Sequence, residues 1–225
     1  MTQDYLSERQ QVVDAVRRIV AAGLVSGSSG NVSRRIITAD GDRYAITASG
    51  VPYSRFGIDD VVIVDAEIDP VFGDGIPSSE SLAHMAVYHA RPDIGAVIHS
   101  HSVYASAFAV AGLPIPCVLD EQVVLLGGAV EVAAYAASAS DALAENAVAA
   151  LGNRAAVLLR HHGAIGVGRD LEHAIAVVEL VERVAKIRIL SVQLGGAHEL
   201  PPDVVTSEQA VYRMINGLSQ EPKET

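Results

Sequence analysis

The chain reads RPDIGAVIHSHS at residues 91–102. The Arg91-Pro92 pair predicts the end of a helix, because the residue before a proline is pushed out of the helical conformation. The apolar residues that follow predict a buried strand that closes on His99. His101 lies two positions further, and side chains two apart in a strand point to the same face. We therefore expect the imidazoles of His99 and His101 to converge on one point.

A second pair of histidines closes another apolar stretch. Residues 155–168 read AAVLLRHHGAIGVG, which we interpret as one long buried strand that carries His161 and His162. Neighbouring residues of a strand face opposite sides, so at most one of these two should join the first pair. Three imidazoles from two strand ends are a common ligand set for a catalytic metal with open positions. Histidines that only form hydrogen bonds at strand ends are the alternative, and the paired pattern favours the metal.

Strands and helices interleave along the whole sequence. This order predicts an α/β fold in which a sheet is covered on both faces by helices, as one domain over residues 1–225. The order of the strands and their directions stay open. Expected strands span 43–50, 60–65, 94–99 and 155–168. Expected helices span 6–20 with a stop at Gly23, about 80–90, 103–111, 138–151 and 170–193, with a last one starting at Ser207 and a frayed end at about 218–225.

Composition and charge exclude several classes of function. Half of the 225 residues are hydrophobic and only 4% are aromatic, so the core must consist of Ala, Val, Leu and Ile. The formal net charge is −11, and no block of Lys or Arg is long enough to follow a phosphate backbone. Nucleic acid is therefore not an expected partner, because phosphate contacts dominate such binding.

The single cysteine, Cys117, excludes an internal disulfide and fits a reducing compartment. We interpret it as a small buried apolar residue. Charged residues are spread through the first twenty positions, unlike a signal peptide. No apolar run is long enough to span a membrane. We therefore expect a cytoplasmic protein with no membrane contact.

Glu80 follows Pro77-Ser78-Ser79 at an expected helix start, and two interpretations compete there. Serine at a helix start with an acidic residue in the first turn is ordinary capping, which the local sequence alone favours. The same turn also presents N–H groups and hydroxyls that suit a phosphate, beside a carboxylate that can act as a general base. The turns at residues 28–31 and 49–50 are similarly rich in donors. Together the three turns suit the capture of a small dianion.

The remaining histidines carry no such pattern. His84 lies one helical turn beyond Glu80 and could support the site, although we favour a surface or capping role. His89, His173 and His198 are expected to be structural.

Five segments in this order resemble the class II aldolase and adducin-head family: GSSGNVS, ITASGVPYS, PSSE, RPDIGAVIHSHS and HHGAIGVG. The resemblance covers the chain from Gly23 to about Leu190, and the motifs are closest to those of L-fuculose-1-phosphate aldolases. It implies a three-layer αβα domain with a central mixed sheet. It also implies a homotetramer with active sites between neighbouring subunits.

The resemblance further assigns roles to individual residues. It implies a divalent metal on His99, His101 and His162, with Zn²⁺ first and Mn²⁺ or Co²⁺ as alternatives. Glu80 matches the catalytic glutamate, which also approaches the metal. The residues that match the positions holding the substrate phosphate are Gly30, Asn31, Ser49, Gly50, Ser78 and Ser79. The implied reaction is the reversible cleavage of a ketose 1-phosphate into dihydroxyacetone phosphate and an aldehyde.

The sequence departs from the family pattern after Ile115-Pro116. A tyrosine that serves as an acid toward the aldehyde oxygen is missing there, and Asp120 or Glu121 stands near its position. A C-terminal family tyrosine also has no secure counterpart, since Tyr212 does not align cleanly. A decarboxylase or an epimerase of the same family is therefore an alternative, the epimerase less so because Asp replaces Glu80 in those relatives. An adducin-like module without catalysis is the third hypothesis, and the intact histidines and Glu80 argue against it.

Overall fold

The computed structural model describes residues 4–218. Its strands are β1 (Asn31–Ile36), β2 (Arg43–Thr47), β3 (Val61–Val64), β4 (Pro70–Phe72), β5 (Ala96–Ser100), β6 (Glu131–Ala133), β7 (Ala156–Leu159) and β8 (Gly163–Gly168). Its α-helices are α1 (Leu6–Ala21), α2 (Ser81–Ala90), α3 (Val103–Ala111), α4 (Asp120–Leu126), α5 (Asp141–Leu151), α6 (Leu171–Gln193) and α7 (Pro202–Ile215).

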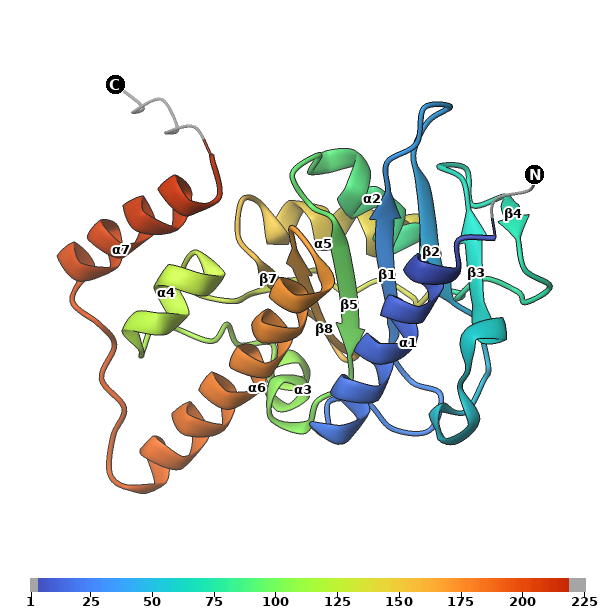
Figure 1. Ribbon diagram of the computed structural model, residues 1–225. Coiled ribbons are helices and arrows are strands. Elements are labelled where there is room, and N and C mark those ends of the chain that lie inside the picture. The colour runs from blue at the N-terminus through green and yellow to red at the C-terminus, as the bar shows by residue number, and fades with distance from the viewer. Residues whose placement is uncertain (1–3, 219–225) are drawn as a thin grey trace.

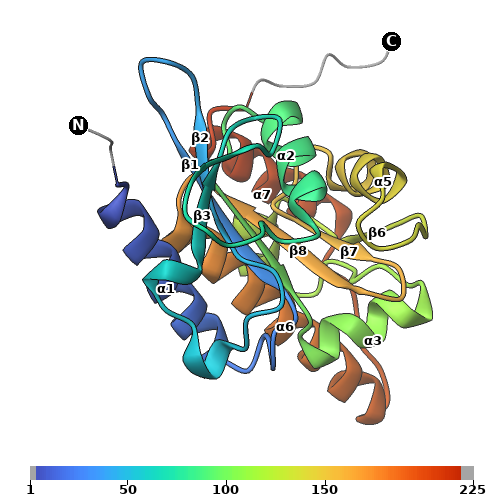
Figure 2. The same ribbon diagram turned by 90° about the vertical axis from the view of Figure 1, so that its right-hand side faces the viewer.

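The strands form one eight-stranded sheet in the order β4-β3-β2-β1-β5-β8-β7-β6. Neighbouring strands are antiparallel except β6 and β7, which are parallel, so the sheet is mixed. Helices α1, α3 and α6 cover one face, and α2 and α5 cover the other (Figures 1 and 2). The expected three-layer α/β fold with a mixed central sheet is confirmed.

Strand β5 shows how this layering positions the histidines. Ala96 and Ile98 pack among residues of α1 and α6, whereas Val97 packs among residues of α2 and α5. Alternation along the strand then turns His99 toward the α2 face. A helix that starts beside the end of β5 can therefore place its first residues against His99.

The interpretation of residues 155–168 as one strand is wrong. The segment is an antiparallel hairpin in which Leu159 pairs with Gly163, and the residues between them form a turn. His161 has a φ of 59°, a left-handed conformation that an extended strand does not contain. The polar Arg-His-His sequence between two apolar runs was the signal of this reversal.

Several elements differ from the sequence-based expectation or were not expected. Strand β1 was missed because its sequence, NVSRRI, is largely polar although the strand lies inside the sheet. Strands β4 and β6 and helix α4 were also missed, since short elements carry little periodic signal. Helix α7 starts at Pro202 and not at Ser207, because proline is well tolerated in the first turn.

The stop of α1 was predicted correctly. Gly23, with a φ of +71°, follows the helix, and the amide of Leu24 donates to the carbonyl of Ile19. The segment expected to fray, 218–225, lies outside the described residues except for Leu218. None of the helices within residues 4–218 is long and apolar enough to cross a membrane.

Candidate active site

The two histidines at the end of β5 converge as their spacing predicts. The Nε2 atoms of His99 and His101 lie 2.8 Å apart, and the ring centroids 4.7 Å apart. His99 is almost completely buried, and His101 is half-buried just beyond the strand. The Nδ1 atom of His99 lies 3.0 Å from the carbonyl oxygen of Ala164. Because a carbonyl only accepts, Nδ1 carries the hydrogen and the Nε2 lone pair faces the cluster.

His162 completes the group of imidazoles from the turn between β7 and β8. Its ring centroid lies 4.7 Å from that of His99 and 5.0 Å from that of His101. His161 is exposed and its ring instead packs edge-on against Tyr135, at a centroid distance of 5.8 Å. The turn between β7 and β8 therefore places His162, and not His161, beside His99 and His101.

Glu80 enters the same cluster immediately before α2. Its Oε2 lies 3.1 Å from Nε2 of His99, and its Oε1 lies 3.2 Å from Nε2 of His162. One ligand atom from each of Glu80, His99, His101 and His162 lies within 4.8 Å of all the others. Glu80 is 8% exposed, so its carboxylate is largely removed from solvent.

The capping interpretation of Glu80 is wrong. Glu80 occupies the N-cap position of α2, but its side chain forms no cap hydrogen bond. The carboxylate instead accepts a hydrogen bond of 2.9 Å from Nδ2 of Asn31 and one of 3.1 Å from Oγ of Ser138. Ser78 supports the turn, since its Oγ accepts from the Glu80 amide at 3.3 Å. The carboxylate is thus held in the cluster by side chains outside α2.

The protonation states in the cluster suit a cation. Burial alone would raise the pKa of the Glu80 carboxyl, but the His99 and His162 imidazoles and two hydrogen bonds outweigh burial and hold the pKa below its usual value. Burial lowers the pKa of His99 and of His101. Neutral imidazoles and an ionised carboxylate are the forms that bind metal. Three nitrogen donors and one carboxylate in this compact arrangement fit a divalent metal ion.

The three donor-rich turns come together next to this cluster. Ala48 pairs with Pro77 as a β-bridge, and the amide of Ser49 donates to the carbonyl of Ile76 at 2.8 Å. These contacts join the turn at 49–50 to the turn at 77–80.

Tyr53 ties the remaining turn to the other two. Its hydroxyl donates to the carbonyl of Gly30 at 2.6 Å, and its amide donates to that of Gly27 at 2.8 Å. Gly30 has a φ of +79°, and a Cβ there would lie 2.6 Å from the His99 carbonyl oxygen, so glycine is required. The sequence did not indicate this role of Tyr53.

The predicted donors differ in how accessible they are. Ser49, Gly50 and Ser79 are exposed, while Asn31 and Ser78 are buried. The amide of Asn31 already contacts Glu80, which local sequence could not indicate because the partners are 49 residues apart. Ser138 was also missed. It too is far from Glu80 in the sequence, and a serine in an alanine-rich loop carries no recognisable signal.

His84 does not have the surface or capping role that the sequence favoured. It is fully buried, and its Nδ1 lies 2.6 Å from Oγ of Ser33, which is 2.8 Å from the hydroxyl of Tyr88. Burial lowers the pKa of His84 to about 4, so the ring is neutral. His89 and His198 are exposed, and neither belongs to the cluster.

Asp120 and Glu121 lie on α4, away from the cluster of their own chain. Glu121 pairs with Arg183 of α6 at 2.7 Å, and Asp120 lies beside Glu208 of α7. Cys117 is half-buried, not fully buried as expected, and burial raises the pKa of its thiol. A thiolate nucleophile is therefore not favoured at this position.

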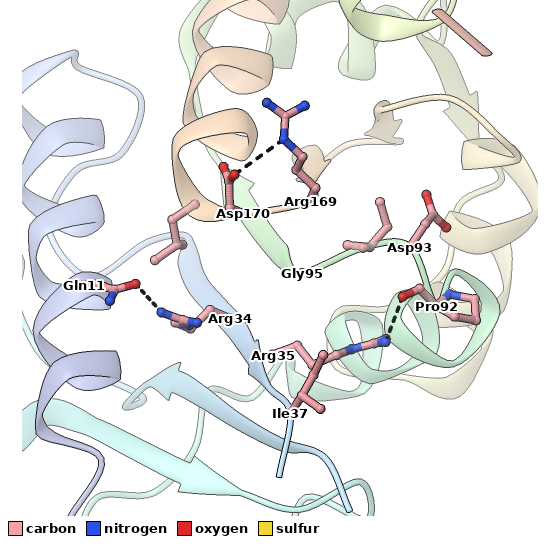
Figure 3. Close-up of a pocket in the computed structure, with 11 residues that line it drawn as sticks. Gln11, Arg34, Arg35, Ile37, Pro92, Asp93, Gly95, Arg169 and Asp170 are labelled. Atoms are coloured by element: carbon pink, nitrogen blue, oxygen red, sulfur yellow. Dashed lines mark hydrogen bonds and ion pairs between the residues drawn. The ribbon is translucent and has the colours of Figure 1, made fainter. Parts of the chain in front are cut away.

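A roomy cavity of about 430 Å³ lies at the other end of β5, beside Gly95 (Figure 3). Its arginines are engaged within the chain: Arg34 with Gln11, Arg35 with the carbonyl of Pro92, and Arg169 with Asp170. The residues that line it include no member of the histidine cluster. This cavity is therefore separate from the histidine cluster, which lies at the opposite end of the strand.

Comparison with known proteins assigns the chain to a family. Residues 10–189 match the family described as Class II Aldolase and Adducin N-terminal domain. The chain belongs to this family. A curated relative, the 5-methylthioribulose-1-phosphate/5-deoxyribulose-1-phosphate aldolase of Rhodospirillum rubrum, is 35% identical over 95% of both chains.

Solved structures of family members have the same fold. An L-fuculose 1-phosphate aldolase superposes with a TM-score of 0.86 at 32% identity, covering 92% of this chain and 96% of the other. YgbL from Klebsiella pneumoniae, titled a putative aldolase/epimerase/decarboxylase, superposes with a TM-score of 0.80 at 26% identity, covering 91% and 99%. The titles of these two structures name more than one reaction, so the site itself must indicate which reaction this chain catalyses.

Proposed function

We propose that this chain is a metal-dependent lyase that reversibly cleaves a ketose 1-phosphate into dihydroxyacetone phosphate and an aldehyde. The observation that carries the proposal is the placement of the Glu80 carboxylate 3.1 Å from His99 and 3.2 Å from His162. A base at this point can reach a substrate carbon whose neighbouring oxygens face the three imidazoles. Aldolases of this family need that combination of base and electrophile.

His99, His101 and His162 would hold the metal, with Glu80 as a fourth ligand before substrate binds. Zn²⁺ is the first choice, and Mn²⁺ or Co²⁺ would also suit three imidazoles. When bound, the metal supplies a Lewis acid that polarises the substrate carbonyl and stabilises the negative charge that develops during carbon–carbon cleavage. Glu80 returns a proton to the carbon that loses the aldehyde, or removes it in the reverse reaction.

The phosphate would bind at the three joined turns, through Gly30, Asn31, Ser49, Gly50, Ser78 and Ser79. Backbone N–H groups and hydroxyls provide this kind of site without a lysine. Support comes from the contacts of Tyr53 and from the bridge between Ala48 and Pro77, which hold the turns side by side next to Glu80.

The aldehyde half of the substrate is expected to be that of a deoxy- or methylthio-pentulose 1-phosphate. The relative from Rhodospirillum rubrum, named for those substrates, supports this class. The tyrosine that acts as an acid in the fuculose-phosphate enzymes is missing here, and Asp120 or Glu121 stands near its position. This difference argues against fuculose phosphate as the substrate. Because both residues lie away from their own cluster, a neighbouring subunit would have to supply the acid.

A homotetramer with active sites between subunits would meet this requirement. Exposed apolar side chains support self-association: Val103 is 71% exposed, Leu113 57% and Val192 55%, along α3, the residues after it and the end of α6. Large exposed apolar patches mark interaction surfaces. A cytoplasmic location, expected from the single cysteine, stays a prediction.

Decarboxylation is the second candidate, because the YgbL relative is titled with that activity among others. The test is to incubate the purified chain, loaded with Zn²⁺, Mn²⁺ or Co²⁺, with a panel of ketose 1-phosphates and of phosphorylated acids. The proposal predicts metal-dependent release of dihydroxyacetone phosphate from at least one ketose 1-phosphate. Release of carbon dioxide from the acids, without any dihydroxyacetone phosphate from the ketoses, would refute the aldolase proposal in favour of decarboxylation.

A further inference from the structure

Both oxygens of the Glu80 carboxylate are held by side chains from distant parts of the chain. Asn31, at the start of β1, donates to Oε2 at 2.9 Å, and Ser138, between β6 and α5, donates to Oε1 at 3.1 Å. The same two oxygens face His99 and His162, respectively. Each oxygen therefore has one hydrogen-bond donor and one imidazole.

A glutamate needs such restraint if it is to act as a base at a defined carbon. Its side chain rotates about three bonds, and a misplacement of about 1 Å can cost about 100-fold in rate. Helix α2 does not restrain the carboxylate, since Glu80 forms no cap hydrogen bond. The restraint must come from the two donors that the structure places on either side.

The two donors belong to different kinds of structural element, a strand inside the sheet and an exposed loop. Asn31 is 4% exposed and pairs with His99 across the strands β1 and β5, so its position is fixed by the sheet. Ser138 belongs to an exposed loop, next to Ala139 with a φ of 61° and Ser140, whose side chain caps α5. The same loop contains Tyr135, whose ring contacts that of His161.

We propose that Asn31 and Ser138 are positioning residues that fix the Glu80 carboxylate from opposite sides, and that the loop at 134–140 thereby sets the orientation of the base. This inference rests on the proposed function, in which Glu80 transfers the proton. Asn31 has a second amide hydrogen, so holding Glu80 does not prevent it from also contacting the phosphate.

Ser138→Ala tests the loop side of the arrangement. A hydrogen bond to a charged group is stronger than one between neutral groups, but water can partly replace an exposed hydroxyl, so we expect kcat to fall by about 5- to 30-fold. The exchange of dihydroxyacetone phosphate protons with deuterated water should slow by the same factor, because it uses Glu80 without the aldehyde. KM should change by less than about twofold, since substrate contacts remain.

Two further variants separate positioning from general disturbance of the loop. Ser138→Thr keeps the hydroxyl and should restore kcat to within about threefold of the wild type. Ser140→Ala removes the α5 cap without touching Glu80, so it should lower the melting temperature and leave kcat within about twofold. Asn31→Ala should lower kcat on phosphorylated and unphosphorylated substrates alike through Glu80, and should raise KM mainly for the phosphorylated substrate, because the proposed phosphate contact is lost as well.

A readout without substrate uses Co²⁺ alone. The visible spectrum of bound Co²⁺ reports the number and geometry of its ligands. We expect the spectrum of Ser138→Ala to shift toward that of Glu80→Gln, while Ser140→Ala keeps the wild-type spectrum. The ratio of metal to chain should stay the same in all three, because the histidines are unchanged.

The inference is overturned if Ser138→Ala matches Ser140→Ala in kcat, proton exchange and Co²⁺ spectrum. It is also overturned if the serine variant raises KM at constant kcat, which would show a direct substrate contact. If the wild type cleaves no ketose 1-phosphate, the proposed function fails instead, and the Co²⁺ spectra alone decide whether Ser138 holds Glu80.

Discussion

At the scale of single residues, the histidines of β5 and of the turn after β7 make the clearest prediction. Replacing His99, His101 or His162 by Ala should abolish bound metal and activity together, because each supplies one of three imidazoles. His161→Ala is the matched control, since that ring faces Tyr135 and should leave metal at its wild-type level. Metal analysis of the four variants is sufficient, and full occupancy in His162→Ala would refute the ligand assignment.

The sequence allowed two of these residues to be found for a simple reason. His99 and His101 are two apart, and a strand places such residues on one face. The choice between His161 and His162 could not be derived in the same way, because both lie in a turn. The contacts that Ser138 and Asn31 make with Glu80 could not be predicted. They are tertiary contacts between residues 58 and 49 positions apart in the sequence, respectively.

At the scale of elements, the turn before α2 should contribute more to the binding of a phosphorylated substrate than to that of its unphosphorylated analogue. Ser78→Ala removes a hydroxyl beside the proposed phosphate site, and a charge-assisted hydrogen bond is worth roughly 1–3 kcal/mol. We expect kcat/KM to fall about 5- to 150-fold for a phosphorylated ketose. The unphosphorylated analogue should lose far less. Equal losses on both substrates would mean that Ser78 only supports the backbone of the turn.

Helix α2 also contains a pH-dependent group, His84. Burial lowers its pKa in the folded chain from 6.5 to about 4, so protonation favours the unfolded state. The contribution of His84 to stability is thus fully present above about pH 6.5 and is lost as the pH falls toward about 4, by up to about 3 kcal/mol.

The measurement is denaturant unfolding of the metal-free chain between these pH values. His84→Asn should show a shallower loss of stability on acidification than the wild type, whereas the exposed His89→Asn should keep the wild-type slope. Parallel slopes for the wild type and His84→Asn would contradict the buried neutral state of His84.

Helices with clear start or stop residues were predicted best. Gly112 directly follows α3, and the side chain of Asp170 caps the start of α6, so both helices appear within a residue or so of the expected bounds. β1 and α4 were missed, the first because it is polar and the second because it is short. The hairpin of β7 and β8 was read as one strand because the turn between two apolar runs was not recognised.

At the scale of the whole molecule, self-association is the open prediction. The wild type should have about four times the mass of one chain in native mass spectrometry, since the α3 and α6 surface is too apolar to stay exposed. The double variant Leu113→Glu/Val192→Glu should dissociate and lose activity. Val71→Glu, at the exposed β4 edge, should remain assembled. A monomeric wild type with full activity would contradict this arrangement.

The central claim is that Glu80 is a base beside a metal and not a helix cap. In Glu80→Gln the side chain keeps its size but loses the carboxylate, so turnover should fall by about 10²–10⁴-fold. We expect the melting temperature to be almost unchanged and the metal to remain on the three histidines. The decisive measurement is turnover of this variant on the best ketose 1-phosphate, with metal content verified in the same sample. Turnover within about threefold of the wild type would contradict the claim.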